Sequence, residues 1–299
     1  MKARLGVAPI AWSNDDLPEL GGDTTLETCL RESRQAGFSG VETGGKCPKT
    51  SAELGPILRD HGLNLASGWY SGTLRTNNVE AEIEQIGPQL SLFKDLGAAV
   101  IVYGETSGTV QNVRDAPLAT RPRIADSDFA AYAGRLTALA EHCADVGVPL
   151  SFHHHMGTAI EQEDEVDRLM AETGEAVGLL FDTGHMRFAG GDPLRMARNH
   201  GSRINHVHMK DVRADVLARI DPSQWSFLDA VLEGVFTVPG DGLIDFSAVA
   251  AVLAEIGYEG WVVVEAEQDP AKANPFEYAK LGQRTLTDAL TAAGYSIVE

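Results

Sequence analysis

The chain has 299 residues, with 24 Lys and Arg against 43 Asp and Glu, and a formal net charge of −19. This length suits one catalytic domain over residues 1–299. The acidic surface repels the phosphate backbone of nucleic acids, so we expect no nucleic-acid partner. No apolar run reaches the roughly 20 residues of a membrane span. Three widely spaced Cys fit a reducing compartment, so we expect a soluble, cytoplasmic protein without a membrane partner.

Eight short apolar segments predict strands along the chain. Seven of them follow a Gly that ends a helix-like segment, and Gly readily takes the left-handed conformation found just past a helix. Strands that alternate with helices and are apolar throughout are typical of parallel sheets. We therefore predict an α/β protein with a single closed (β/α)8 TIM barrel. The predicted strands lie at residues 5–10, 40–42, 63–69, 99–103, 148–153, 177–181, 204–209 and 261–264.

Helix starts agree with this pattern. Thr50 with Glu53 and Thr158 with Glu161 have the spacing of capping boxes, and Pro follows a capping residue at Asp192-Pro193 and Asn274-Pro275. Three longer connections, at residues 14–23, 106–127 and 212–245, are on the side where barrel enzymes build active sites. Residues 213–239, with Trp225 and Phe227, could instead form a structural excursion or an oligomer contact.

Ionisable residues follow most of the predicted strands, and a closed barrel brings strand ends to one mouth. They are Glu42, Glu105, His153-His154-His155, Asp182 with His185, His206-x-His208-x-Lys210-Asp211, and Glu265-Ala266-Glu267. Alternation along a strand puts His153 with His155, His206 with His208, and Glu265 with Glu267 on shared faces. Mixed imidazole and carboxylate ligands suit Mn²⁺, Co²⁺ or Zn²⁺ better than Ca²⁺, so we predict a divalent metal site.

Each of these residues also has a purely structural explanation. Asp182 could cap a helix, Glu42 or Glu105 could solvate a loop, and His206 is expected deeper in the barrel. The metal hypothesis therefore depends on the coincidence of ionisable residues after four successive strands rather than on any single residue.

Several motifs resemble a known family. The strand-end motifs Asp182-Thr183-Gly184-His185 and His208-x-Lys210-Asp211, with the run from Gly257 to Glu265, resemble the xylose isomerase-like superfamily of sugar isomerases, epimerases and dehydratases. More specific segments resemble the myo-inosose dehydratases of bacterial inositol catabolism, over essentially the whole chain. These segments are residues 6–16, 153–158 and 265–275.

This resemblance implies one metal ion held by four residues, which are His153, Asp182, His208 and Glu265. Superfamily members usually have Glu after the fifth strand, where this chain has His153, so His155 is the alternative ligand. The implied ion is Mn²⁺ or Co²⁺, with Zn²⁺ and Mg²⁺ as further candidates.

The resemblance also implies a reaction, the removal of water from 2-keto-myo-inositol through an enediolate to give a trihydroxycyclohexane-1,2-dione. The expected partner is thus a small polyhydroxylated cyclic ketone. Lys210, His155 and Glu267 are the candidates for proton transfer, although Lys210 paired with Asp211 could merely brace the site.

Four further residues are candidates for substrate binding. Glu42 and His185 could orient substrate oxygens, and Trp12 and Trp69 could form apolar walls, with core packing as the alternative for both Trp. A ketose epimerase or isomerase on the same barrel, or a polyol-binding protein without catalysis, are the competing interpretations. Homo-oligomer formation is left open.

Overall fold

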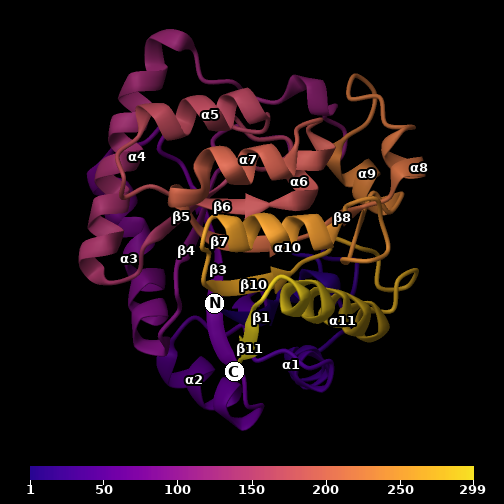
Figure 1. Cartoon of the computed structure of the whole chain (residues 1–299). Helices are drawn as coiled ribbons and strands as arrows, with labels where there is room; N and C mark the ends of the chain where they lie inside the picture. The colour runs from indigo at the N-terminus through magenta and orange to yellow at the C-terminus, as the bar shows by residue number, and fades with distance from the viewer.

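The computed structural model describes residues 1–299 and contains a closed barrel of parallel strands surrounded by helices (Figure 1). The sheet order is β10-β7-β6-β5-β4-β3-β2-β1, and β1 pairs with β10 to close the barrel. The predicted closed barrel is therefore confirmed. Its strands are β1 (Lys2–Val7), β2 (Gly40–Thr43), β3 (Asn64–Gly72), β4 (Ile101–Glu105), β5 (Leu150–His153), β6 (Gly178–Asp182), β7 (Ile204–Met209) and β10 (Gly260–Val264).

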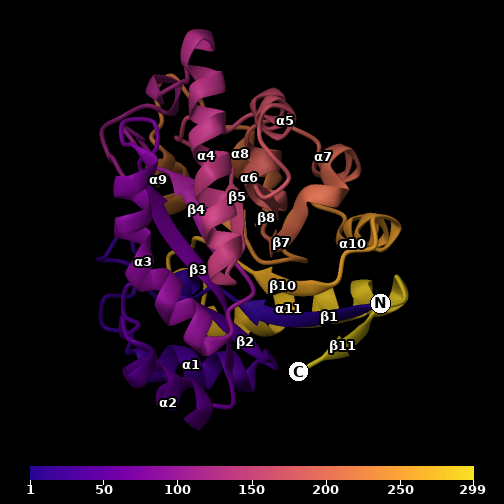
Figure 2. The ribbon, with the colours of Figure 1, turned by 90° about the vertical axis from the view of Figure 1, so that its left-hand side faces the viewer.

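Helices follow the strands and form the outer layer, as Figure 2 shows from the side. They are α1 (Leu26–Gln35), α2 (Ser51–Asp60), α3 (Val79–Leu96), α4 (Asp126–Val146), α5 (Glu163–Glu172), the short α6 (Thr183–Phe188), α7 (Pro193–His200), α10 (Phe246–Glu255) and α11 (Pro275–Ala292). Gly97 and Gly147 end α3 and α4 with φ of 71° and 97°, the conformation predicted for these positions. Pro starts α7 and α11 as expected.

Alternation along the strands separates the core from the site. In β5, Leu150 and Phe152 point outward into the main hydrophobic core, and His153 lies on the opposite, inner face. In β7, Val207 and Met209 join that core, which leaves His208 on the inner face. The apolar residues that bury the strands under helices thus also fix which polar side chains enter the barrel.

Two local predictions were wrong. The first strand ends at Val7 rather than Ile10, because Pro9–Ala11 forms a 3-10 helix (η1) that turns the chain. Thr158 does not start a helix: its hydroxyl donates to the carbonyls of His155 and Ile160, and α5 starts after Gln162, which makes the capping box with Glu165 instead.

The long connection after β7 is a folded excursion. It contains β8 (Asp211–Val212), α8 (Ala214–Leu217), α9 (Phe227–Leu232) and β9 (Phe236–Thr237), and the antiparallel β8 and β9 pair with each other. In Figure 1 these elements lie together at one side of the barrel. A second hydrophobic cluster, which includes Leu17, Met156, Phe227 and Phe236, packs them over the barrel mouth. Residues 213–239 therefore form a folded excursion, one of the two alternatives predicted for them. Their use as an oligomer contact stays a prediction.

The chain ends close to where it begins, as both ribbon views show (Figures 1 and 2). The last strand, β11 (Ser296–Val298), pairs in parallel with Lys2–Arg4 of β1, and this strand was not predicted. None of the helices is both long and apolar enough to cross a membrane.

Candidate active site

A cavity of about 500 Å³ opens at the mouth of the barrel, where the strands end. Its wall includes Glu42 of β2, His153 at the end of β5, His155 after β5, His208 of β7, and Glu265 and Glu267 after β10. The loop after β1 adds Asp15 and Asp16, β3 adds Trp69 and Ser71, and the loop after β4 adds Thr109, Gln111 and Asn112. No Lys or Arg side chain lines this cavity.

Four buried side chains converge at the bottom of the cavity, and we call His153, Asp182, His208 and Glu265 the metal cluster. One ligand atom from each lies within 4.8 Å of all the others. His153 Nε2 and His208 Nδ1 lie 3.5 Å and 3.6 Å from Asp182 Oδ2, and Glu265 Oε2 is in direct contact with His208 Nδ1. These are the four residues that the family resemblance implies as ligands, and His155 is not among them.

Hydrogen bonds fix the orientation of both imidazoles in the metal cluster. His153 Nδ1 donates to the His154 carbonyl over 2.6 Å, which turns the Nε2 lone pair toward Asp182. His208 Nε2 donates to Glu42 Oε1 over 2.9 Å, which turns Nδ1 toward Asp182 and Glu265. A backbone or carboxylate partner on the far nitrogen is the usual arrangement of a metal-binding His.

The donor set fits a divalent ion. Asp182 Oδ2, His208 Nδ1 and Glu265 Oε2 are buried and have no hydrogen-bond partner outside their own cluster, although buried polar atoms are ordinarily paired. All three point to one place, from which His153 Nε2 is also within reach. Two carboxylates with two imidazoles suit Mn²⁺, Co²⁺ or Zn²⁺.

The carboxylates in and around the metal cluster favour a positively charged group between them. Burial raises the pKa of Glu265, but Lys210 and His208 outweigh it and bring this pKa to about 2. Burial also raises the pKa of Asp182, and Lys210 and His185 hold it well below its ordinary value. Burial lowers the pKa of His208, whereas Glu42 and Glu265 raise it well above the ordinary value. Both carboxylates are therefore ionised, and without a metal ion His208 is protonated between Glu42 and Glu265, so a cation bound at Nδ1 would replace that proton.

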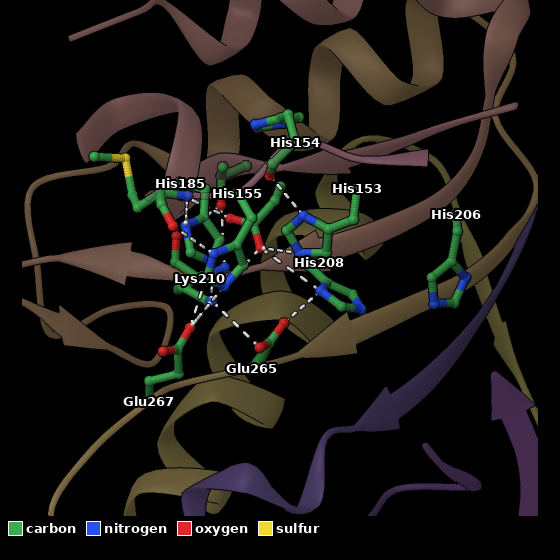
Figure 3. Close-up of polar contacts among 12 residues, drawn as sticks. His153, His154, His155, His185, His206, His208, Lys210, Glu265 and Glu267 are labelled. Atoms are coloured by element: carbon green, nitrogen blue, oxygen red, sulfur yellow. Dashed lines mark hydrogen bonds and ion pairs between the residues drawn. The ribbon is translucent and has the colours of Figure 1, made fainter. Parts of the chain in front are cut away.

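A second group of buried side chains lies beside the first, and we call Lys210, Glu267, His185 and His155 the lysine cluster (Figure 3). Lys210 Nζ lies 2.7 Å from Glu267 Oε1, 2.8 Å from His185 Nε2 and 3.2 Å from Glu265 Oε1. Burial lowers the pKa of Lys210, but Glu265, Glu267 and Asp182 raise it far above the ordinary value. The ammonium is therefore charged and links the two clusters.

His155 presents a neutral ring to the cavity. Its Nδ1 donates to the Met156 carbonyl over 2.8 Å, which leaves Nε2 as an acceptor, 3.8 Å from Glu267 Oε1. Burial lowers the pKa of His155 to about 4, so the ring is uncharged at neutral pH. Trp69 lies edge-on to it, with 5.6 Å between ring centroids, and Phe227 of the excursion lies at 5.1 Å.

Not all predicted residues reach the cavity as expected. Trp12 is 1% exposed and packs in the main core, where its Nε1 donates to Glu32 over 2.7 Å, because η1 turns it away from the mouth. Trp69 does line the cavity. His185 is buried behind Lys210 and is not part of the cavity wall, so a direct contact with a substrate oxygen does not fit its position.

Three other polar residues have structural partners. Asp211 does not pair with Lys210, because it accepts the backbone N–H groups of Gly240, Gly242 and Ile244 and so holds the end of the excursion. Glu105 accepts the N–H groups of Ser107 and Arg75 and serves the loop after β4. Glu42 lines the cavity, but its Oε1 is occupied by His208, His206 and Ser67.

His154 and His206 lie outside the metal cluster, as expected. Figure 3 shows the His154 ring turned away from the other labelled side chains and His206 standing apart from the rest. Both ring nitrogens of His154 are buried without a hydrogen-bond partner. His206 contacts Ser67 and Glu42 below His208.

Sequence reasoning missed three residues near the cavity. Asp16 lines it and Ser67 fixes Glu42, and neither was assigned a role. Phe227 was noted only as part of the excursion. The acidic pair after the first strand was a usable signal for Asp16, whereas the contacts of Ser67 and Phe227 depend on the folded barrel.

Comparison with known proteins identifies the family. The family described as Xylose isomerase-like TIM barrel matches residues 30–289. The chain belongs to this family. It is 53% identical over 298 residues to the Rhizopine catabolism protein MocC of Rhizobium meliloti, with 99% of this chain and 91% of that protein covered. It is 46% identical over 280 residues to an inosose dehydratase of Geobacillus thermodenitrificans (strain NG80-2), with 93% and 94% covered. The resemblance to the inosose dehydratases is thus confirmed.

A solved structure of this xylose isomerase-like type agrees in fold. The IOLI protein with a binding zinc atom superposes with a TM-score of 0.70 over 97% of this chain and 99% of that one, at 17% identity. At that identity the match supports the barrel architecture alone.

Proposed function

We propose that this protein is a metal-dependent lyase that removes one water from 2-keto-myo-inositol to give a trihydroxycyclohexane-1,2-dione in inositol catabolism. The observation that carries the proposal is a set of buried ligand atoms on Asp182, His208 and Glu265 that have no hydrogen-bond partner outside their own cluster, with His208 and Glu265 lining the cavity at the barrel mouth. The homology to inosose dehydratases over nearly the whole length supports the choice of substrate.

The cavity suits an uncharged polyol. Five carboxylates line it, from Asp15, Asp16, Glu42, Glu265 and Glu267, and no Lys or Arg does. A phosphorylated or carboxylated sugar would meet a negative potential there, whereas hydroxyl groups find acceptors in the carboxylates, in His155 Nε2 and in polar side chains such as Gln111. The substrate class is therefore a neutral, polyhydroxylated ring ketone.

His153, Asp182, His208 and Glu265 would hold the divalent ion, with Mn²⁺ or Co²⁺ as the proposed metal. Bound there, the ion would supply Lewis-acid stabilisation of the negative charge that develops on the ketone oxygen. The chain itself must then move two protons, one from the carbon α to the ketone and one to the departing hydroxyl group.

Glu267 is our candidate for the base. It lines the cavity, and its Oε2 is buried without a hydrogen-bond partner while Lys210 holds Oε1. A carboxylate with one oxygen fixed and one free is positioned to take a proton from a ring carbon. His155 Nε2, next to it, would accept a hydrogen bond from a substrate hydroxyl group.

Lys210 acts as a positioning residue in this proposal. It is fully buried, is not part of the cavity wall, and shares its ammonium among Glu265, Glu267 and His185. These contacts orient one metal ligand and the base together. The pairing of Lys210 with Asp211 has no part in it.

The test is product analysis with purified protein loaded with Mn²⁺ or Co²⁺. With 2-keto-myo-inositol we expect a ring dione, lower in mass by one water, identified by NMR and mass spectrometry. An epimer of unchanged mass would instead favour the epimerase alternative, and binding without turnover would favour a polyol-binding protein.

A second candidate is a step in rhizopine catabolism, favoured by the 53% identity to the Rhizobium meliloti protein. The same assay with rhizopine-derived ring ketones distinguishes the two. Higher kcat/KM for such a compound than for 2-keto-myo-inositol would assign the protein to this second pathway.

A further inference from the structure

The loop after β1 carries an acidic side chain, Asp16, over the cavity, and the loop is tied down on both sides of this residue. The buried Asn14 accepts the N–H groups of Asp16 and Leu17 on its Oδ1, over 2.8 Å and 2.9 Å. Asp15 accepts the N–H of Gly45 over 2.8 Å, and Leu17 is buried in the second hydrophobic cluster. The backbone of Asp16 is therefore held in place by the loop itself.

The carboxyl group of Asp16 has no partner within the protein. It is half-buried and lines the cavity, yet it accepts no hydrogen bond and makes no ion pair. Its neighbour Asp15 and the buried Glu82 and Asp211 all bind backbone N–H groups. A fixed, unpaired carboxyl group on a cavity wall is available to whatever occupies the cavity.

Three charged groups act on Asp16 from different elements: Glu267 after β10, Lys210 after β7 and Asp15 on the same loop. Burial, followed by the charges of Glu267 and Asp15, raises the pKa of Asp16 to about 7, while Lys210 opposes this. Near neutral pH the group is thus partly protonated and can donate a proton, which an ordinary Asp cannot do.

We propose that Asp16 is the catalytic acid that protonates the hydroxyl group leaving the ring. This inference rests on the proposed dehydration. It is carried by the position of a carboxyl group without a partner on the wall of the cavity that Glu267 also lines.

The proton balance is simple. A base, for which Glu267 is our candidate, takes the proton from the carbon α to the ketone, and the electron pair of that C–H bond becomes the enolate. The enolate pair then forms the ring double bond as the β carbon–oxygen bond breaks. The Asp16 carboxyl group gives its proton to the leaving oxygen, so that water departs and Asp16 becomes a carboxylate. The unsaturated product tautomerises to the dione, and the proton on the base returns to Asp16 or to solvent.

The experiment separates the two proton transfers with Asp16→Asn in the metal-loaded, full-length protein. In D2O with 2-keto-myo-inositol, we expect water loss to slow by about 100-fold or more, because a general acid contributes about 10²–10⁴ in rate. The recovered substrate should still gain deuterium at the α carbon, because enolate formation does not use Asp16. A sample without protein corrects for spontaneous exchange.

The pH profile gives a second readout. A general acid must be protonated, so wild-type turnover should fall as the pH rises above about 7, with the pKa of Asp16. This alkaline limb should vanish in Asp16→Asn and persist in Asp16→Glu, which keeps a carboxyl group. Glu19→Gln is the matched control, since it removes one charge from an exposed position of the same loop and should leave the rates and the profile unchanged.

The outcomes are distinct once metal content and thermal unfolding show that the variants are intact. If the wild type forms no dione, the proposed function fails and the inference falls with it. If the wild type is active and Asp16→Asn eliminates water equally fast with the same pH profile, the role of Asp16 alone is overturned. Loss of both water elimination and α-deuterium exchange in Asp16→Asn would also overturn it, because Asp16 would then act before the leaving group departs.

Discussion

The metal cluster and the lysine cluster lie side by side and use the same kinds of side chain, imidazoles and carboxylates on the inner face of the barrel. Both could hold a metal ion by the spacing of their ligand atoms. They differ in their source of positive charge. Lys210 Nζ lies within 2.8 Å of both Glu267 and His185, whereas Asp182 Oδ2, His208 Nδ1 and Glu265 Oε2 have no hydrogen-bond partner. One cluster therefore contains a permanent cation, the Lys210 ammonium, whereas the positive charge of the other comes from the titratable His208, whose Nδ1 a metal ion can take over.

The largest effect is expected from Asp182→Asn. This substitution removes one ligand charge, but an Asn oxygen can still accept the His185 N–H that Asp182 Oδ1 accepts at the start of α6. We expect metal affinity to fall by more than about 100-fold, since even outer partners of a metal site cost 10- to 100-fold. Calorimetric metal titration measures it, and activity should fall in parallel. Asp192→Asn, at the matching cap of α7, is the control and should bind metal normally.

Lys210→Met should break the lysine cluster. It leaves Glu267 and Glu265 without their buried counter-ion, and the expected loss is about 3–5 kcal/mol in the free energy of unfolding. Without the ammonium the pKa of Glu265 rises, so part of the lost stability should return as the pH falls and protonates this carboxyl group. Denaturant unfolding at several pH values tests this. Lys280→Met, which breaks an exposed pair with Glu277, should cost less than about 1 kcal/mol. Equal losses in the two variants would contradict the account.

Glu42→Gln should lower the metal affinity of the metal cluster through His208, which Glu42 orients. Glu42 lies outside the four ligands, and its Oε1 accepts from His208 Nε2. Removing this charge should lower metal affinity by about 10- to 100-fold while the fold is kept. Glu105→Gln offers the contrast, because that buried carboxylate binds Tyr103 and the loops after β3 and β4, and it should cost stability without changing metal affinity. Unchanged metal affinity in Glu42→Gln would remove Glu42 from the site.

The smallest effect is expected from His154→Leu. This ring directly follows β5 and is turned away from the metal cluster, and burial, together with His153, lowers its pKa to about 3, so it is neutral. Because neither ring nitrogen has a partner, an apolar side chain of similar volume should change the free energy of unfolding by no more than about 1.5 kcal/mol. Metal affinity should not change. A marked loss of metal in this variant would mean that His154 contributes to the cluster after all.

The site could be predicted where strand periodicity decides the geometry. A residue in a parallel strand points either into the barrel or toward the helices, so apolar neighbours such as Phe152 and Val207 reveal the inner positions of His153 and His208. Adjacent strand ends of a closed barrel then bring these residues together. Periodicity thus places ionisable residues at one barrel mouth, whereas the choice of His153, Asp182, His208 and Glu265 as the ligands comes from the family resemblance.

The remaining contacts depend on loop paths, which have no such periodicity. The 3-10 turn after β1 takes Trp12 into the core, and the return of the excursion past Gly240 takes Asp211 away from Lys210. Thr158 has the spacing of a helix cap, but its hydroxyl binds carbonyl groups of its own loop. In each case a contact within the folded protein outweighs the local sequence pattern. The sequence pattern alone does not predict that contact.

The most direct measurement is anomalous X-ray diffraction from crystals of the protein grown with Mn²⁺ or Co²⁺. We predict one strong anomalous peak within bonding distance of His153 Nε2, Asp182 Oδ2, His208 Nδ1 and Glu265 Oε2. We expect no peak among His155, His185 and Glu267, where Lys210 supplies the positive charge. A peak in the lysine cluster, or none in the metal cluster at saturating metal, would contradict the central claim.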